Sequence, residues 1–339
     1  MRTYAGIDLH SSNSYVGIID EQDKRLYKKR LPNRMDDILT ALSPFKDSLE
    51  GVVVESTYNW YWLVDGLEEE GYTVHLASPA AIKQYEGLKH TDDQSDAFWL
   101  AHMRRLGILA EGYIYPKEQR EVRDLLRRRL LFVRHRTTHI LSLQSMVTRN
   151  LGYKLSNNEI KKLKEMDAKE LFDSPNLIAM AQNSIAAIEF LAKVIKRIEK
   201  TVMSQVKMRK EFEMLLTIPG IGNILGLTIM LEVGDIKRFQ NVGNYSSYCR
   251  CVGSNKISNG KKKGENNKRN GNKYLAWAYV EAANFATRYC SSAQRFYQRK
   301  LAEKNGIVAV KALSNKMCRA SYYMMRDQVP FNETMLFRS

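Results

Sequence analysis

Four carboxylates lie where acidic side chains can bind a cation and act on a phosphate: Asp8, Glu55, Asp93 and Asp96. A divalent metal such as Mg²⁺ is held by one or two carboxylates together with phosphate and water oxygens. Two such ions can flank a scissile phosphate and stabilise both the attacking and the leaving oxygen. The set therefore predicts a two-metal site for phosphodiester chemistry, in which Mn²⁺ can replace Mg²⁺.

The first of these carboxylates stands at the rim of a predicted β-hairpin. Residues 3–10 predict a strand with Ala5 and Ile7 on one face and Asp8 on the other, and residues 15–19 predict the returning strand. A buried carboxylate without partners is costly, so Asp8 requires a cation, hydrogen-bond donors or water. The alternative is an aspartate that only caps its own turn.

The other three carboxylates end a strand or begin a helix. Residues 51–55 form a β-branched run without alternation, which predicts a central strand buried on both faces and ending on Glu55. A predicted helix running to about residue 106 carries Asp93 and Asp96 on one face of its first turn. Capping of the helix N-terminus explains Asp92 and Asp93 well, whereas a metal explains Asp93 and Asp96 together.

The charge balance indicates a polyanionic partner. The 339 residues include 53 Lys and Arg against 37 Asp and Glu, a formal net charge of +16. Nucleic acid is the commonest reason for such an excess, and a solvated basic surface is the alternative. The sequence shows neither a targeting segment nor an apolar run that would span a bilayer, and its four cysteines match no zinc or disulfide framework. We therefore expect a cytoplasmic protein without membrane association.

Three basic regions are candidates for phosphate contacts. Residues 118–152 and 177–210 predict two long helices that form an antiparallel hairpin or a coiled-coil arm, with seven arginines between positions 120 and 136. Residues 255–273 hold seven basic residues and six asparagines around Ser258, which predicts a mobile basic loop. The predicted nucleic-acid-binding residues are Arg120, Arg123, Arg127, Arg128, Lys256, Lys261, Lys262, Lys263, Lys268, Arg269 and Lys273.

A Pro-Gly-Ile-Gly turn lies between two helical runs in residues 215–225. It resembles the helix-hairpin-helix element, in which backbone N–H groups at a helix start meet a DNA phosphate without reading its sequence. An ordinary tight turn between helices is the alternative.

Five short motifs occur in an order that resembles the DEDD-type insertion-sequence transposases with a C-terminal serine, the bridge-RNA-guided recombinases: Gly-Ile-Asp8, Val-Glu55-Ser, Asp93-x-x-Asp96-Ala, Ile-Pro-Gly-Ile-Gly222 and Gly271-Asn-Lys-Tyr-Leu275. The resemblance covers nearly the whole chain. It implies an α/β RNase H-like (RuvC-like) mixed sheet with flanking helices in residues 1–115. An α-helical coiled-coil arm in 116–210 and a small, mainly α IS116/IS110/IS902-type domain in 211–339 would follow.

The resemblance also implies roles for individual residues. The four carboxylates would bind the metal, with Asp92 as an alternative to Asp93, and Ser258 would attack DNA to form a phosphoserine link. Ser254 is the alternative nucleophile, although Cys251-Val-Gly-Ser254 lacks the proline that many members carry. The implied partners are double-stranded donor and target DNA, a structured bridge RNA and further copies of the chain in a homodimer or homotetramer. The expected location is the nucleoid of a bacterial or archaeal cell.

Two other functions remain open. In a RuvC-like Holliday-junction nuclease, water would attack the phosphate and Ser258 would be an ordinary loop residue. In a non-catalytic nucleic-acid-binding protein, the acidic residues would only cap helices. A covalent protein–DNA adduct distinguishes the recombinase from the nuclease, and metal-dependent cleavage distinguishes both from the binding protein.

Overall fold

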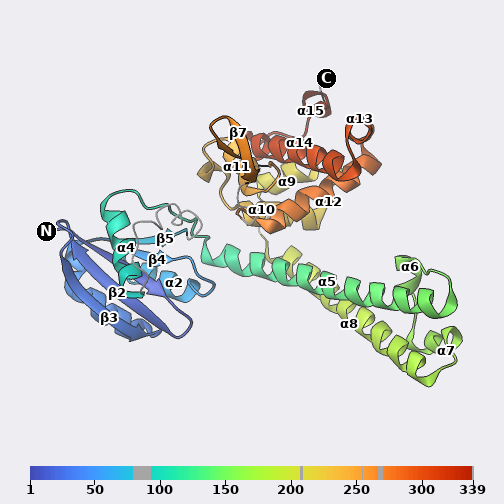
Figure 1. Ribbon diagram of the computed structural model, residues 1–339, viewed down its shortest axis with the longest axis horizontal. Helices are drawn as coiled ribbons and strands as arrows, with labels where there is room; N and C mark the ends of the chain where they lie inside the picture. Colours follow the sequence, from blue (N-terminus) through green and yellow to red (C-terminus); the bar gives the residue numbers. More distant parts are fainter. Residues whose placement is uncertain (79–92, 207–208, 254, 266–269, 338–339) are drawn as a thin grey trace. The chain divides into compact units, whose positions relative to one another are not determined.

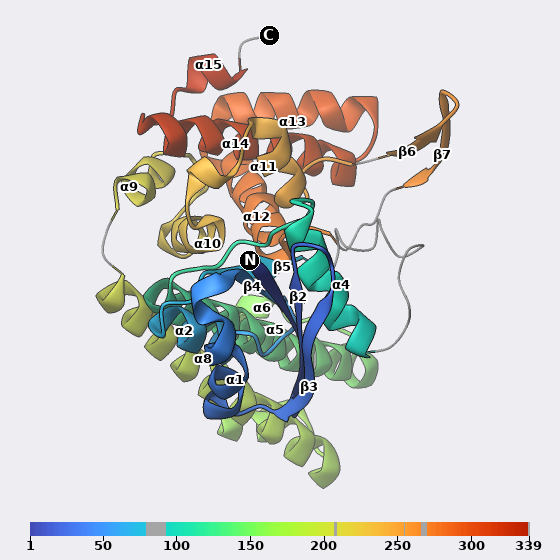
Figure 2. The same ribbon diagram turned by 90° about the vertical axis from the view of Figure 1, so that its left-hand side faces the viewer.

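The computed structural model describes residues 1–78, 93–206, 209–253, 255–265 and 270–337, without the side chains of residues 93, 94, 255, 256 and 265. The chain forms two compact units, Met1–Lys117 and Glu118–Ser339, drawn in Figure 1 and turned by 90° in Figure 2. The predicted helix after Pro79 and the candidate residues Asp92, Ser254, Lys268 and Arg269 lie outside the described residues.

The first unit is built on a five-stranded sheet with the strand order β3-β2-β1-β4-β5. Strands β1, β2 and β3 are antiparallel neighbours, whereas β4 runs parallel to β1 and β5 runs parallel to β4. The predicted mixed α/β sheet is therefore confirmed. The strand bounds are β1 Thr3–Leu9, β2 Asn13–Asp20, β3 Arg25–Pro32, β4 Leu49–Glu55 and β5 Val74–Ala77.

Helices cover both faces of this sheet, with α1 and α2 on one side and α4 on the other (Figure 2). The β-branched run in β4 follows from this arrangement: Val52 and Val54 belong to the core under α1 and α2, whereas Val53 packs with Leu100 and Met103 of α4. A strand between two helical layers needs apolar residues on both faces. The helical elements are α1 Met35–Leu42, η1 Ser43–Ser48, α2 Tyr61–Glu69 and α4 Asp93–Arg105.

The second unit begins with an antiparallel helical hairpin. Leu126 near the start of α5 shares a buried cluster with Val202 near the end of α8, and Val147 near the end of α5 shares another with Ala181 near the start of α8. The two predicted long helices are present; that they form a coiled coil stays a prediction. The bounds are α5 Lys117–Leu151, α6 Asn157–Ile160, η3 Glu165–Asp167, α7 Ala168–Leu171 and α8 Pro175–Gln205.

Helix α8 is long and apolar enough, by length and composition, to cross a membrane, and it is the one such helix among the described residues. Six of its apolar residues are buried in the two hairpin clusters, while Lys196, Arg197 and Lys200 are exposed. The six are Ala181, Ile185, Ile188, Val194, Ile198 and Val202. This division into an apolar and a charged side is the pattern of an amphipathic core helix.

The C-terminal helices share one core with the base of the hairpin. Leu126 and Val202 lie in the same buried cluster as Leu231 of α10, Tyr279 of α12 and Leu313 of α14. The predicted boundary at residues 210 and 211 therefore does not separate two cores. The elements are α9 Lys210–Leu216, α10 Asn223–Val233, η4 Ile236–Arg238, α11 Val242–Tyr248, β6 Asn255–Ser258, β7 Lys261–Glu265, α12 Lys273–Tyr289, α13 Ser291–Glu303, α14 Gly306–Asp327 and α15 Glu333–Phe337.

Residues 255–265 form an antiparallel β-hairpin rather than the predicted loop. Its turn is Asn259-Gly260, with φ angles of 49° and 68°. Two consecutive positive φ angles are what a type I′ turn requires, and Asn-Gly is the preferred pair for it. We call β6, β7 and this turn the serine hairpin, because Ser258 ends β6.

Candidate active site

Asp8 and Glu55 lie side by side at the ends of two adjacent parallel strands. Strands β1 and β4 pair with Ile7 opposite Val54, so the next residue of each strand is a carboxylate facing the same side of the sheet. This is the side that α4 covers, because Val53 packs against that helix. A side-chain hydrogen bond joins the Asp8 and Glu55 carboxyl groups.

Two glycines allow α4 to lie directly on the sheet and bring in Asp96. Gly6 of β1 pairs with Gly17 of β2. A Cβ at Gly6 would clash with the Ala97 carbonyl oxygen, and a Cβ at Gly17 would lie 3.0 Å from the Phe98 ring. The close contact between Gly6 and Ala97 places the preceding residue, Asp96, near Asp8, where its charge acts on the Asp8 carboxyl group. We call Asp8, Glu55 and Asp96 the carboxylate face.

The environment of Asp8 disfavours its negative charge. Its exposed fraction is 4%, and this burial raises the pKa of the carboxyl group to about 6. The charges of Glu55 and Asp96 contribute to this raised pKa, whereas His10, whose Nε2 lies 3.2 Å from Asp8 Oδ2, acts to lower it. These three carboxylates repel one another when ionised, and a bound cation would reduce this repulsion.

Two asparagines fix the backbone that follows Asp8. The side-chain amides of Asn33 and Asn59 both donate to the carbonyl oxygen of His10, at 3.0 and 2.9 Å. Ser14 in turn donates to the Asn33 side-chain oxygen at 2.6 Å. Sequence reasoning missed these residues, since a single asparagine in a connecting segment carries no periodic signal.

Metal binding at the carboxylate face stays a prediction. Among the described side chains, no group of three His, Cys, Asp or Glu residues is arranged as a complete metal-binding group. Asp93 begins α4, one helical turn before Asp96, and its side chain is outside the description. The described carboxylates suit a hard cation, because such ions take oxygen ligands and their charge stabilises the ionised form of Asp8.

Ser258 lies in the second unit, on the exposed serine hairpin. It pairs with Lys261, and Lys262 and Lys263 follow on β7, all of them exposed. The neighbouring Ile257 is 66% exposed, so the hairpin has little apolar anchorage. The serine hydroxyl is thus accessible to a polyanion and surrounded by positive charge.

Comparison with known families identifies both units. A family model described as Transposase matches residues 5–150, which include the carboxylate face, and one described as Transposase IS116/IS110/IS902 family matches residues 212–298, which include the serine hairpin. The chain carries transposase domains of the IS110/IS116/IS902 family. Two curated relatives have matching names, the "Probable family 20 transposase" of Pseudomonas aeruginosa and the "Transposase for insertion sequence element IS1111A" of Coxiella burnetii.

The similarity to these transposases extends over whole chains. The Pseudomonas protein is 22% identical over 336 residues, covering 94% of this chain and 96% of the relative. The Coxiella protein is 22% identical over 320 residues, covering 92% of this chain and 86% of the relative. An insertion-sequence transposase transfers DNA, so DNA is the substrate class of this chain.

Two of the arginines predicted to bind nucleic acid are buried in the transposase. Arg120 and Arg123 have exposed fractions of 3% and 4%, and that they contact nucleic acid stays a prediction. They precede Leu126 and Leu130 at helical spacing and therefore share the buried face of α5. Arg128, one position off that face, is exposed, as is Lys273 at the start of α12.

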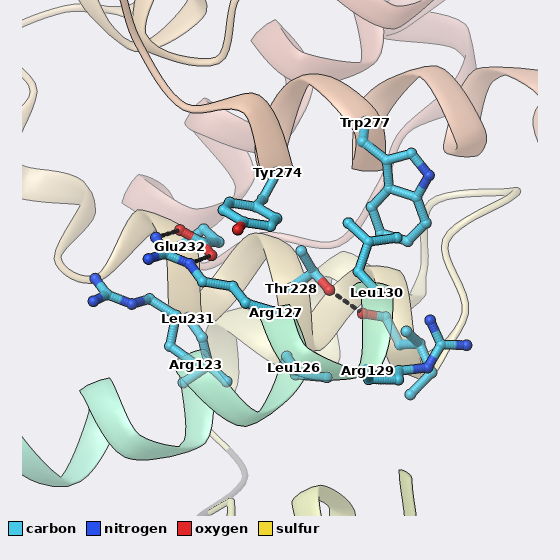
Figure 3. Close-up of a pocket in the computed structure, with 11 residues that line it drawn as sticks. Arg123, Leu126, Arg127, Arg129, Leu130, Thr228, Leu231, Glu232, Tyr274 and Trp277 are labelled. Atoms are coloured by element: carbon cyan, nitrogen blue, oxygen red, sulfur yellow. Dashed lines mark hydrogen bonds and ion pairs between the residues drawn. The ribbon is translucent and has the colours of Figure 1, made fainter. Parts of the chain in front are cut away.

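Arg127 forms a buried ion pair that sequence reasoning missed (Figure 3). Its Nε and Nη2 atoms donate to the two carboxylate oxygens of Glu232 at 2.6 and 2.7 Å. Burial alone would lower the pKa of Arg127, but the hydrogen bonds to Glu232 raise it above its usual value. The ion pair gives Arg127 a structural role, and its contact with a phosphate stays a prediction.

Glu232 also holds the residue that begins α12. The Asn272 side-chain amide donates to Glu232 at 2.7 Å, while its oxygen accepts from the backbone N–H groups of Tyr274 and Leu275. This N-cap explains why Gly-Asn precedes the helix. The Arg127 guanidinium lies 4.6 Å from the Tyr274 ring centroid. One buried carboxylate thus joins α5, α10 and α12. The feature of the sequence that could have indicated this role is that Glu232 is the lone acidic residue within an apolar helix.

Proposed function

We propose that this transposase cuts and rejoins DNA through a phosphoserine intermediate formed on Ser258, with Mg²⁺ held by the carboxylate face and Asp93. The observation that carries the proposal is the convergence of Asp8, Glu55 and Asp96 on one side of the sheet, in a chain whose second unit presents an exposed serine among lysines. Bound metal ions would supply Lewis-acid polarisation of the scissile phosphate.

The chemistry of the serine step is a transesterification. The Ser258 Oγ loses its proton and forms a bond to phosphorus, the bond from phosphorus to one deoxyribose oxygen breaks, and that oxygen takes up a proton. One phosphodiester bond replaces another, so the energy needed for rejoining is retained. Lys261 and Lys262 stand in the same hairpin and would stabilise the charge that develops on the phosphate.

The proposal includes an RNA partner and an oligomer. The resemblance to bridge-RNA-guided recombinases implies a structured RNA that selects donor and target DNA, and a homodimer or homotetramer in which the carboxylates and the serine act together. The basic charge of the chain suits both nucleic acids. Purification after co-expression with the flanking non-coding sequence should recover a structured RNA with the protein. Recovery of the protein alone, with flanking sequences of several lengths, contradicts the RNA partner.

The decisive experiment traps the covalent intermediate. The full chain is incubated with labelled donor and target DNA, guide RNA and Mg²⁺, denatured during turnover and digested, and the labelled peptide is sequenced. We expect DNA attached to the peptide that contains Ser258. The Ser258→Ala variant should bind DNA and RNA with unchanged affinity, because an exposed hairpin residue contributes little packing, but should neither cleave nor rejoin.

Two further variants separate the alternatives. Asp8→Asn should abolish cleavage while the exposed Asp47→Asn, which removes the same charge from the same unit, should not. Continued nicking by Ser258→Ala without an adduct indicates a nuclease that uses water. An adduct on Ser254 assigns the nucleophile to that residue, and absence of cleavage under all metal conditions leaves only a binding protein.

A further inference from the structure

A cationic cleft lies between α8 and the start of α10, away from the serine hairpin in sequence. It encloses about 660 Å³, and its lining includes Lys196, Arg197 and Lys200 of α8 together with Asn223 and Ile224 of α10. The three cationic side chains are exposed, and none has an ion-pair or ring partner among the described residues. The one acidic residue of the lining, Glu199, is occupied by Arg129, whose Nε donates to it at 2.7 Å.

A second hollow adjoins this cleft and adds aromatic surface. It encloses about 440 Å³ and shares Asn223 and Ile224 with the first, but its far wall is formed by Phe285 and Tyr289. These two residues are four positions apart on α12, so they lie on one face, with exposed fractions of 37% and 73%. Exposed aromatic rings beside positive charge are the combination that binds unpaired nucleobases and their phosphates.

The Pro-Gly-Ile-Gly turn contributes Gly220, Ile221 and Gly222 to the lining of the second hollow and packs closely on α12. Gly220 has a φ of 93°, and a Cβ there would clash with the Ala282 carbonyl oxygen and lie 2.6 Å from the Ala286 nitrogen. The turn therefore packs directly on α12, next to Phe285. As a result, the spacing between the cations of α8 and the rings of α12 is fixed within one compact core.

We propose that this surface binds an unpaired polynucleotide strand, with its phosphates on Lys196, Arg197 and Lys200 and its bases stacked on Phe285 and Tyr289. A paired duplex hides its base faces, whereas a single strand offers them to aromatic side chains. The inference rests on the proposed function, in which strands are opened and exchanged. The same chemistry is presented by single-stranded DNA and by an unpaired segment of RNA, and the test distinguishes them.

The test measures equilibrium binding of fluorescent oligonucleotides by the full chain carrying Asp8→Asn, in EDTA, so that the result does not depend on cleavage. The cleft variant is K196Q/R197Q/K200Q. The control is K161Q/K162Q/K169Q, which removes the same charge from exposed lysines near α6 and α7. For single strands, the slope of log affinity against log salt is about 0.7 per phosphate contact, so loss of three contacts should reduce this slope by about 2. When the salt is lowered tenfold, from 1 M to 0.1 M, the affinity of the cleft variant should therefore rise about a hundredfold less than that of the parent.

The aromatic half is tested separately. Tyr289→Ala should weaken single-strand binding about 5- to 150-fold, whereas Tyr289→Phe, which keeps the ring, should bind as the parent does. A stronger effect with DNA than with RNA oligonucleotides assigns the displaced DNA strand, and the reverse assigns the RNA. Equal losses in the cleft variant and its control, or equal losses for duplex and single strands, overturn the inference while leaving the serine adduct experiment unaffected.

Discussion

The carboxylate face and the serine hairpin present their reactive groups in opposite ways. Asp8 is 4% exposed, hydrogen bonded to Glu55 and covered by a helix that packs against Gly6. Ser258 is exposed at the end of a strand whose neighbour Ile257 is 66% exposed. The first group is positioned by the core of its own unit. The second lies on a hairpin with little apolar anchorage.

The largest effect is expected where the carboxylate face is most tightly packed. Gly6→Ala places a methyl group against the backbone of α4 at Ala97, so either the helix or the strand must move. We expect a loss of about 3 kcal/mol or more in the free energy of unfolding, measured by urea denaturation, together with loss of DNA cleavage. Gly112→Ala is the control, since its nearest neighbour would be 3.4 Å away. Wild-type stability of Gly6→Ala would show that α4 is not held against β1.

A smaller effect is expected from the charge of Asp8. Its pKa in the folded protein is raised to about 6, so the folded state binds more protons than the unfolded state between about pH 4 and 6, and stability falls as the pH rises through this window. Each pKa unit corresponds to about 1.4 kcal/mol in the free energy of unfolding, and screening by solvent near the sheet edge reduces this contribution. Because Asp8→Asn removes the charge, we expect this variant to be on the order of 1–2 kcal/mol more stable than wild type at pH 8 in EDTA.

The same comparison at about pH 3 should show almost no difference, because Asp8 is then largely protonated in both the folded and the unfolded state. Asp47→Asn, an exposed site, should show no such gain at either pH. Added Mg²⁺ should stabilise wild type and not Asp8→Asn. A gain for Asp8→Asn that is independent of pH would contradict the assigned charge effect.

The smallest effect on global stability is expected in the serine hairpin. Gly260→Ala forces a side chain into a left-handed conformation with a φ of 68°, which costs about 1 kcal/mol, but the strain falls on a hairpin that carries no core. The melting temperature should change little, whereas hydrogen exchange at residues 257–263 and the rate of strand transfer should change clearly. A large fall in melting temperature would mean that the hairpin is packed as firmly as the carboxylate face.

The elements that depend on local pattern could be predicted from the sequence. The β-branched run ending at Glu55 predicted a strand covered on both sides, and residues 118–152 predicted a long helix; both are present. The sequence placed Asp96 and Asp8 in one predicted site but did not show the contact that brings them together. That contact depends on Gly6 admitting α4, between residues about ninety positions apart.

The charged residues of the second unit were harder to predict, since burial of a charge depends on a distant partner. Nothing near Arg127 in the sequence indicates Glu232, which lies 105 residues away. The hairpin was missed for a different reason. Its strands, Asn-Lys-Ile-Ser and Lys-Lys-Lys-Gly-Glu, are mostly polar and lack alternating apolar residues. Composition therefore suggested a loop, although Asn259-Gly260 is a strong turn signal.

The buried Glu232 carboxylate has a mechanical consequence. It is bonded at once to α5, to α10 through its own backbone, and to the residue that begins α12. Removing one partner of a buried ion pair costs about 3–5 kcal/mol, so these three helices are held firmly together at the base of the helical hairpin. Helix α5 is 35 residues long, which corresponds to a length of about 52 Å. A partner that moves the far end of α5 would therefore also move the C-terminal helices. This movement would reach α12, which follows the serine hairpin in the sequence.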